Sequence, residues 1–399
     1  VWTAHHFVVD EVAVNRVIDE LGRTVTDGPE SLPPVYGSPY GFPVVEQAWT
    51  DDVAIERRAR DFAKLVGPLA PPLPAVPAAG DEQALFLPGE LVQRIHARCD
   101  AWRCTPFLPL MAAYGLALQD TFGEAWRHVL TPYSRRCEPE LMEPVGYLLD
   151  MRLMEAGARP GESLADALRR LHREIIAAQQ PRFESAERLA EALTEISPEA
   201  STALFQFGFT WRHRSRAPVR FGKGGAIPLA VQQKGARFGL CLHLATDDAG
   251  IRASVEAVTP AFDSGAVAAF GRAFLARLDT VAALDITGFA APHSDPEPAR
   301  DAPSEAADSH RREEVRRAAA DAWRTILGRP PADDEDDFLA AGGSSLLALR
   351  MAARLRRDAG LELNIAAFLA RPDFAGLCRQ LGTPRAAPTG RKSAVGCPD

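Results

Sequence analysis

Long apolar stretches, paired cysteines and an excess of basic charge are all absent from this 399-residue chain. No run of 18 or more apolar residues occurs, so no segment is expected to span a bilayer. The net charge of −8 leaves no broad basic surface for nucleic acid or anionic lipid. Lysine supplies only four of the 45 basic residues, and the arginines are interleaved with acids instead of forming a patch. We therefore expect neither a nucleic-acid partner nor a membrane partner.

The six cysteines show no C-x-x-C spacing, and they stand in apolar or helical contexts. A disulfide framework or a zinc site would need a more regular pattern of cysteines. The sequence therefore predicts reduced thiols, a cytoplasmic location and no bound metal.

The chain is longer than one ordinary domain of about 100–200 residues. A segment rich in proline, alanine and acidic residues at 290–307 is typical of an extended linker. It separates a large unit at 1–289 from a small unit at 308–383. The tail at 384–399 has no periodicity, and we expect it to be disordered.

The large unit mixes helical and strand-like stretches without a regular order. Helices are expected at 15–21, 53–66, 90–101, 106–122, 164–179 and 266–283. Strands are expected at 128–131, 147–153, 203–211, 227–232 and 240–245. No early G-x-G-x-x-G motif accompanies them, which argues against a dinucleotide-binding fold. The pattern indicates an α/β sandwich of irregular order.

The small unit has only helical patterns, at 311–327, 345–359 and 373–381, and this predicts a small helical bundle. Two glycines and two serines, ending at Ser345, stand immediately before the second helix. The glycines allow a tight turn, and the free N–H groups at the helix start suit a phosphate. Alternatively, Ser344 or Ser345 is only an N-cap of the helix.

The residues around these serines resemble the acyl- or peptidyl-carrier domain, whose pattern is roughly D-x-F-x-x-x-G-G-x-S-L. The resemblance covers 308–383 and implies a four-helix bundle. It implies that Ser345 carries a covalent phosphopantetheine arm, attached by a phosphopantetheinyl transferase, whose thiol holds an acyl or aminoacyl group as a thioester. Asp336 and Asp337 would then be loop residues, and Phe338 would be buried beneath the loop.

Near the start of the chain, a histidine pair is followed by a carboxylate in the order His5-His6-x-x-x-Asp10. A histidine oriented by its surroundings can act as a general base. The same spacing also occurs by chance, and a histidine pair can be a plain loop feature or an adventitious metal site.

This motif resembles the active-site motif of condensation domains in nonribosomal peptide synthetases, within the chloramphenicol-acetyltransferase-like superfamily. Later segments resemble further motifs of that family in the family's order: 105–107, 130–136, 144–148, 178–184 and 203–209. The resemblance extends to about residue 285 and implies that His6 positions or deprotonates an attacking amine or hydroxyl. It implies a structural role for Asp10, which would bond to backbone or to an arginine, and a minor, structural role for His5.

The chain departs from the family pattern at Glu11, where glycine is usual, at Asp150 in the "FVNT" strand, and at Gln179 and Gln180 in the "HQD" motif. The family also places a whole N-terminal lobe before the histidine motif. We therefore expect a condensation domain incomplete at its N-terminus, through a truncated or misassigned start, a lobe supplied by a separate polypeptide, or degeneration. No adenylation domain stands before the carrier, so an adenylation protein acting in trans would load it.

The resemblances imply thiotemplated formation of an amide or ester bond in the biosynthesis of a nonribosomal peptide-type product, with neighbouring carrier or synthetase modules as partners. An alternative is a carrier and docking protein whose condensation-like lobe is inactive. A third hypothesis, a free-standing acyltransferase using soluble thioesters such as coenzyme A, is disfavoured by the attached carrier and by the absence of a DFGWG motif.

Overall fold

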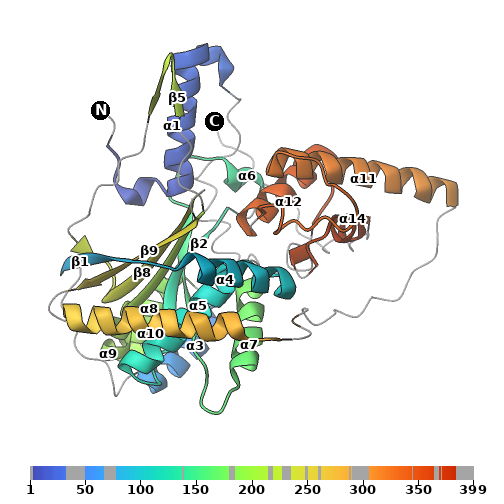
Figure 1. Ribbon diagram of the computed structural model, residues 1–399. Coiled ribbons are helices and arrows are strands. Elements are labelled where there is room, and N and C mark those ends of the chain that lie inside the picture. Colours follow the sequence, from blue (N-terminus) through green and yellow to red (C-terminus); the bar gives the residue numbers. More distant parts are fainter. Residues whose placement is uncertain are drawn as a thin grey trace.

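The chain forms two units, each with its own apolar core, in a computed structural model (Figure 1). The structure describes residues 3–32, 50–66, 78–136, 139–178, 185–213, 219–226, 235–247, 250–258, 262–286, 289, 305–343, 345–363, 368–369 and 371–382.

A mixed seven-stranded sheet organises the first unit, in the order β3-β2-β4-β8-β9-β1-β7. Strand β4 runs parallel to both of its neighbours, β2 and β8, and the other pairings are antiparallel. The strands are β1 (Ala78–Leu85), β2 (His128–Ser134), β3 (Leu149–Glu155), β4 (Phe207–His213), β7 (Gly235–Ala236), β8 (Leu240–Asp247) and β9 (Gly250–Val258).

Helices pack against this sheet, and α5 (Phe107–Phe122) packs side by side with α10 (Ser264–Ala283). The ring of Tyr114 on α5 contacts Phe209 on β4 and Phe270 on α10, and all three side chains are fully buried. The apolar length of α5 is thus explained by its burial on both sides. The remaining helices are α3 (Asp52–Val66), α4 (Gly89–Trp102), α7 (Leu164–Ala177), α8 (Ala186–Ile196) and α9 (Pro198–Ala203).

A second group of elements projects from the sheet layer, as Figure 1 shows. It contains the 3₁₀ turns η1 (His6–Val8) and η2 (Pro29–Ser31), the helix α1 (Glu11–Asp27) and the hairpin β5 (Val219–Phe221) and β6 (Gly224–Ala226). The hairpin packs on α1, where the Gly222 N–H donates to Thr26 Oγ1 at 2.9 Å. The short helix α6 (Pro139–Met142) follows β2.

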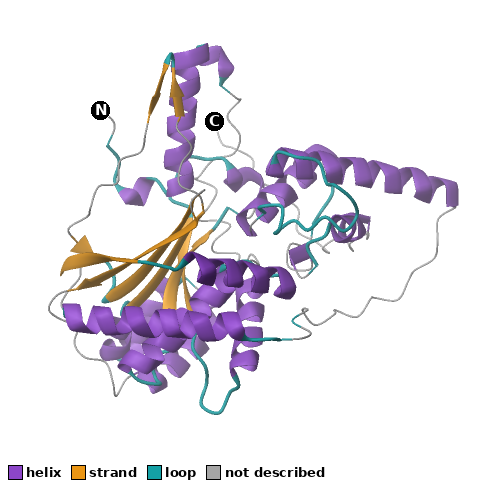
Figure 2. Ribbon diagram, in the orientation of Figure 1, coloured by secondary structure: helices purple, strands orange, loops and turns teal. Residues whose placement is uncertain are grey.

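The second unit is built from helices in the described residues (Figure 2). They are α11 (Glu305–Leu327), α12 (Ser345–Ala359) and α14 (Phe374–Gly382). Its core is aromatic: the ring of Phe338 contacts those of Trp323 and Phe368, and Trp323 also contacts Phe374.

The α/β class of the first unit and the helical class of the second are confirmed. The predicted helices are all present, with shifted ends, and α11 starts inside the predicted linker at Glu305. The expected strand at 227–232 lies outside the described residues, whereas β1, β9 and α8 were not predicted. The domain boundaries at 289, 307 and 383 remain predictions. No helix in the described residues is long and apolar enough to cross a membrane.

Candidate functional site

Asp10 ties the histidine motif to distant parts of the first unit. It is 1% exposed and caps α1, where the Ala13 N–H donates to its Oδ1 at 2.8 Å. Its Oδ2 accepts from the Leu148 N–H at 3.0 Å, and Arg136 Nη2 lies 3.0 Å from both carboxylate oxygens. Asp10 therefore bonds to both backbone and an arginine, as a structural role requires.

Arg136 organises the loop that carries α6. Beyond Asp10, its guanidinium donates to four backbone carbonyls, those of Leu141, Met142, Pro144 and Gly146. Burial lowers the pKa of Arg136, and the Asp10 carboxylate acts in the opposite direction. Because a buried guanidinium needs all these acceptors, the loop and the histidine motif are held by one side chain.

The ring of His6 is oriented from both sides. Its Nδ1 lies 2.8 Å from the carbonyl oxygen of Val9, which can only accept, so Nδ1 carries the proton. In the neutral ring, Nε2 then keeps the lone pair and can accept a proton. The Tyr147 ring contacts His6 edge-on at 5.4 Å. His6 is exposed, so its Nε2 can meet a substrate.

His5 and Glu11 flank this arrangement, and both side chains are exposed. Glu11 is the first residue of α1, where a negative charge suits the positive end of the helix dipole. The departure from glycine at this position is therefore compatible with the local helix.

Asp150, the second departure, forms a buried ion pair. Arg135 Nη2 lies 3.1 Å from Asp150 Oδ1, with side chains 9% and 0% exposed. Burial raises the pKa of Asp150 to about 6, against the opposing charge of Arg135. Both charges also act on Tyr147, whose pKa is raised mainly by burial. The changed residue is therefore within electrostatic range of Tyr147, whose ring contacts His6. Gln179 and Gln180 lie outside the described residues.

Two other histidines have their rings largely enclosed by the first unit: burial lowers the pKa of His128 to about 3 and that of His172 to about 4. His243 does more than fill space. Its Nδ1 lies 2.8 Å from Thr210 Oγ1 and its Nε2 lies 3.2 Å from Glu256 Oε2, across β4, β8 and β9. The sequence could not reveal this chain, because strand register alone brings the three residues together.

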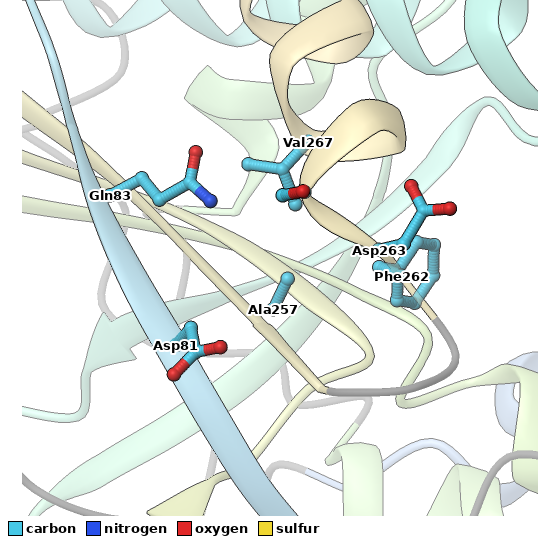
Figure 3. Close-up of a pocket in the computed structure, with 7 residues that line it drawn as sticks. Asp81, Gln83, Ala257, Phe262, Asp263 and Val267 are labelled. Carbon is cyan, nitrogen blue, oxygen red and sulfur yellow. The ribbon is translucent and has the colours of Figure 1, made fainter.

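A cavity of about 330 Å³ lies apart from these residues, between β1, β9 and the start of α10 (Figure 3). Its buried floor is apolar and its exposed rim is polar, with two carboxylates. The lining residues are Asp81, Gln83, Ala257, Phe262, Asp263, Ser264 and Val267. None of them belongs to the His6 site.

In the second unit, Ser345 is the first residue of α12. Gly342 has φ +90°, a conformation that favours glycine. A Cβ at Gly343 would lie 2.3 Å from the carbonyl oxygen of Phe338, which already accepts from the Gly343 N–H. The two glycines thus make a tight turn over Phe338 that leads into the helix. Ser344 lies outside the described residues.

The acidic residues before this turn support it. Asp337 Oδ1 accepts from the Leu339 and Ala340 N–H groups, and Asp336 pairs with Arg329 at 2.6 Å. Phe338 is 0% exposed, which confirms its predicted burial. Ser345 is the first residue of a 15-residue helix that follows this turn, and the N–H groups at the start of a helix have no partner within the helix and suit a phosphate. These residues fit a phosphopantetheine group.

Comparison with known proteins assigns both units. Residues 317–381 match the family described as phosphopantetheine attachment site. Malpinin synthetase of Mortierella alpina is 21% identical over 274 residues, which are 65% of this chain and 4% of the relative. Tyrocidine synthase 2 of Brevibacillus parabrevis is 22% identical over 288 residues, 70% of this chain and 8% of the relative. Pyochelin synthetase of Pseudomonas aeruginosa is 42% identical over 64 residues, which are 16% of this chain and 4% of the relative.

Solved structures extend the comparison to the fold. The first condensation domain of the CDA synthetase is 19% identical with a TM-score of 0.51, covering 70% of this chain and 62% of that domain. The SgcC5 protein of Streptomyces globisporus is 20% identical with the same TM-score, covering 70% of this chain and 68% of that one. The first unit therefore has the α/β fold of solved condensation domains, and the second contains a phosphopantetheine-binding carrier domain, which indicates a covalently attached phosphopantetheine.

The chain spans only 4–8% of the length of malpinin synthetase and tyrocidine synthase 2, and less than 70% of the two solved structures.

Proposed function

We propose that this chain is a carrier, with an attached condensation unit, in thiotemplated biosynthesis of a nonribosomal peptide-type product. The observation that carries the proposal is the position of Ser345 at the start of α12, inside the segment 317–381 that matches the phosphopantetheine attachment family. Ser345 would hold the arm by a phosphodiester. When attached, the arm supplies a thiol that carries an acyl or aminoacyl group as a thioester.

His6 would serve the bond-forming step. Its ring is held by Val9 and Tyr147 so that Nε2 can bind the proton of an attacking amine or hydroxyl. Asp10 would act through Arg136 and the backbone, as a positioning residue that keeps His6 in this orientation.

The carrier requires partners. A phosphopantetheinyl transferase would attach the arm, and neighbouring synthetase modules would deliver and receive acyl groups. No stretch between the condensation-like unit and the carrier resembles an adenylation domain, so we propose that an adenylation protein acts in trans. The cysteines of the described residues are free, three of them buried, which supports a cytoplasmic location.

A second candidate is a carrier and docking protein whose condensation-like unit is inactive. The buried Arg135–Asp150 pair favours it, because Asp150 puts a carboxylate into the strand where the family pattern has neutral polar residues. Under this hypothesis His6 would have no chemical role, and the carrier function would be unchanged.

The carrier proposal is tested by incubating the full chain with a phosphopantetheinyl transferase and coenzyme A. Intact mass should increase by one arm, and the variant Ser345→Ala should gain none. Ser344→Ala is the matched control and should load normally. Loading of Ser345→Ala, or loss of loading in Ser344→Ala, would contradict the assignment.

The two candidates differ in the role of His6. The loaded chain is supplied with an acylated upstream carrier and an amine acceptor, and product is measured by mass spectrometry. Activity should disappear in His6→Ala and persist in His5→Ala. Equal product from both variants and the native chain would exclude a catalytic His6, and no product from the native chain would favour the docking protein.

A further inference from the structure

The carrier unit touches the first unit at two places. Helix α12 packs against α6, the short helix after β2 (Figure 1). Arg103, at the end of α4, reaches the carrier's Asp373 with 3.6 Å between Nη1 and Oδ2. The two contacts come from segments of the first unit that are far apart in sequence, so together they define one orientation of the carrier.

Charge is complementary across the first contact. The segment 138–143, which contains α6, has the sequence Glu-Pro-Glu-Leu-Met-Glu, whereas α12 contains four arginines and one aspartate. Burial lowers the pKa of Arg350 on α12, and the nearby charge of Glu143 opposes this change. Glu143 also pairs with Arg16 of α1 at 3.1 Å. Glu143 thus links the start of the first unit to the carrier helix.

The part of the first unit that contacts α12 is α6, in the loop that Arg136 organises. Its guanidinium donates to the carbonyls of Leu141 and Met142 on α6 and pairs with Asp10 of the histidine motif. The charge of Arg350 is close enough to contribute to the lowered pKa of Arg136, after burial. The seat of the carrier and the His6 site therefore share one buried side chain.

Ser345 opens the same helix that α6 contacts. Leu347 and Arg350 follow it by two and five residues, within the first turn and a half of α12. An enzyme that modifies Ser345 must therefore approach a helix that α6 already contacts.

We infer that α6 and Glu143 form an acidic seat for this chain's own carrier, and that occupation of this seat excludes the transferase that loads Ser345. The inference rests on the proposed carrier function. The carrier is loaded when it leaves the seat and returns to it for work at His6. The 15 residues between Phe289 and Glu305 reach at most about 50 Å, enough to release the carrier without separating the units.

The test compares initial rates of phosphopantetheine loading on the full chain. Glu143→Lys changes only the first unit and leaves the carrier, the transferase's target, intact. It should load about threefold faster or more at low salt, since the rate follows the fraction of unseated carrier. The control Glu195→Lys, an exposed site on α8, makes the same charge change away from α6 and should load at the native rate. The difference between Glu143→Lys and the native chain should shrink at about 0.5 M salt.

The charge-swap variant Glu143→Lys with Arg350→Glu should return toward the native loading rate, whereas Arg350→Glu alone should resemble Glu143→Lys. Equal rates for all variants would overturn the seat. A rate advantage that depends on protein concentration would instead mean that the seat holds the carrier of a second copy, and would equally refute the inference. If Ser345→Ala still loads, the proposed function fails, whatever the relative rates.

Discussion

The two units build their functional residues in different ways. In the carrier unit, the hydrogen bonds of the turn before Ser345 join residues 337–343, and Phe338 beneath the turn packs on Trp323 and Phe368 of the same unit. In the condensation-like unit, the carboxylate of Asp10 bonds to residues 126 and 138 positions away, Arg136 and Leu148.

This difference has an energetic consequence. A local site forms whenever its own helix and loop form, so it tolerates changes elsewhere in the chain. A site that depends on a buried ion pair between distant segments forms only when the whole unit has folded. We therefore expect substitutions at the Asp10–Arg136 site to unfold much more structure than substitutions at the turn before Ser345.

The largest effect is expected at Asp10. The variant Asp10→Ala leaves Arg136 buried without its counter-charge and should lower the unfolding free energy of the first unit by about 3–5 kcal/mol. Asp263→Ala is the matched control, because Asp263 also caps a helix but is exposed, and it should cost about 1 kcal/mol. Urea denaturation followed by tryptophan fluorescence measures both.

Ser345 should still be loaded in Asp10→Ala, at the native rate or faster, since the carrier has its own core and a loosened α6 loop would hold the carrier less firmly. Similar losses in the two aspartate variants would show that Asp10 is only a helix cap, and a loss of loading would show that the carrier depends on the first unit.

The next effect concerns pH. Burial raises the pKa of Asp150 to about 6 in the folded chain, from 3.8, so between about pH 4 and 6 the folded state binds the proton more tightly than the unfolded state. The contribution of Asp150 to stability is therefore present at pH 4 and is lost as the pH rises through 6. The shift corresponds to about 3 kcal/mol.

The pH dependence due to Asp150 is measured as the difference in unfolding free energy between the native chain and the variant Asp150→Asn. Burial keeps His128 and His172 neutral, with pKa values of about 3 and 4. Their effect is opposite to that of Asp150, because they reduce the stability of the folded chain as the pH falls below 6.5. Subtracting the unfolding free energies of Asp150→Asn from those of the native chain removes these contributions. The native chain should gain relative to the variant on going from pH 7 to pH 4, and a flat difference would contradict the prediction.

The difference between local and long-range contacts also explains which features the sequence could predict. The helix that starts at Ser345 follows from a short local pattern, because glycine turns and helix starts are local, and the burial of Phe338 was implied by the resemblance to carrier domains. The role of Arg136 could not be predicted from spacing, since its carbonyl partners are chosen by the folded loop. The resemblance to a known family pointed to an arginine partner for Asp10 without identifying it.

Two central strands were missed for a physical reason. In β9 the alternating residues on the buried face are Ile251, Ala253, Val255 and Ala257, and alanine is a weak strand former. Strand β1 has the sequence AAGDEQAL and contains no β-branched residue. Strand β9 is determined by pairing with β8 and β1, and β1 by pairing with β9; this tertiary context is not visible in local residue preference.

The smallest effect tests whether the carrier's site is as local as its contacts indicate. Gly343→Ala places a Cβ 2.3 Å from the carbonyl oxygen of Phe338 and 2.4 Å from its ring, so the backbone must shift, at a cost of about 1–3 kcal/mol. Gly342→Ala is the control, with open space around its Cβ and only the strain of φ +90°, about 1 kcal/mol. Thermal unfolding should show the larger loss in Gly343→Ala, confined to the carrier transition, together with slower loading of Ser345, because the turn that presents the serine rests on Phe338. If both variants load at the native rate while losing stability, Ser345 is presented by α12 alone, and the turn contributes to the fold of the carrier without contributing to its modification.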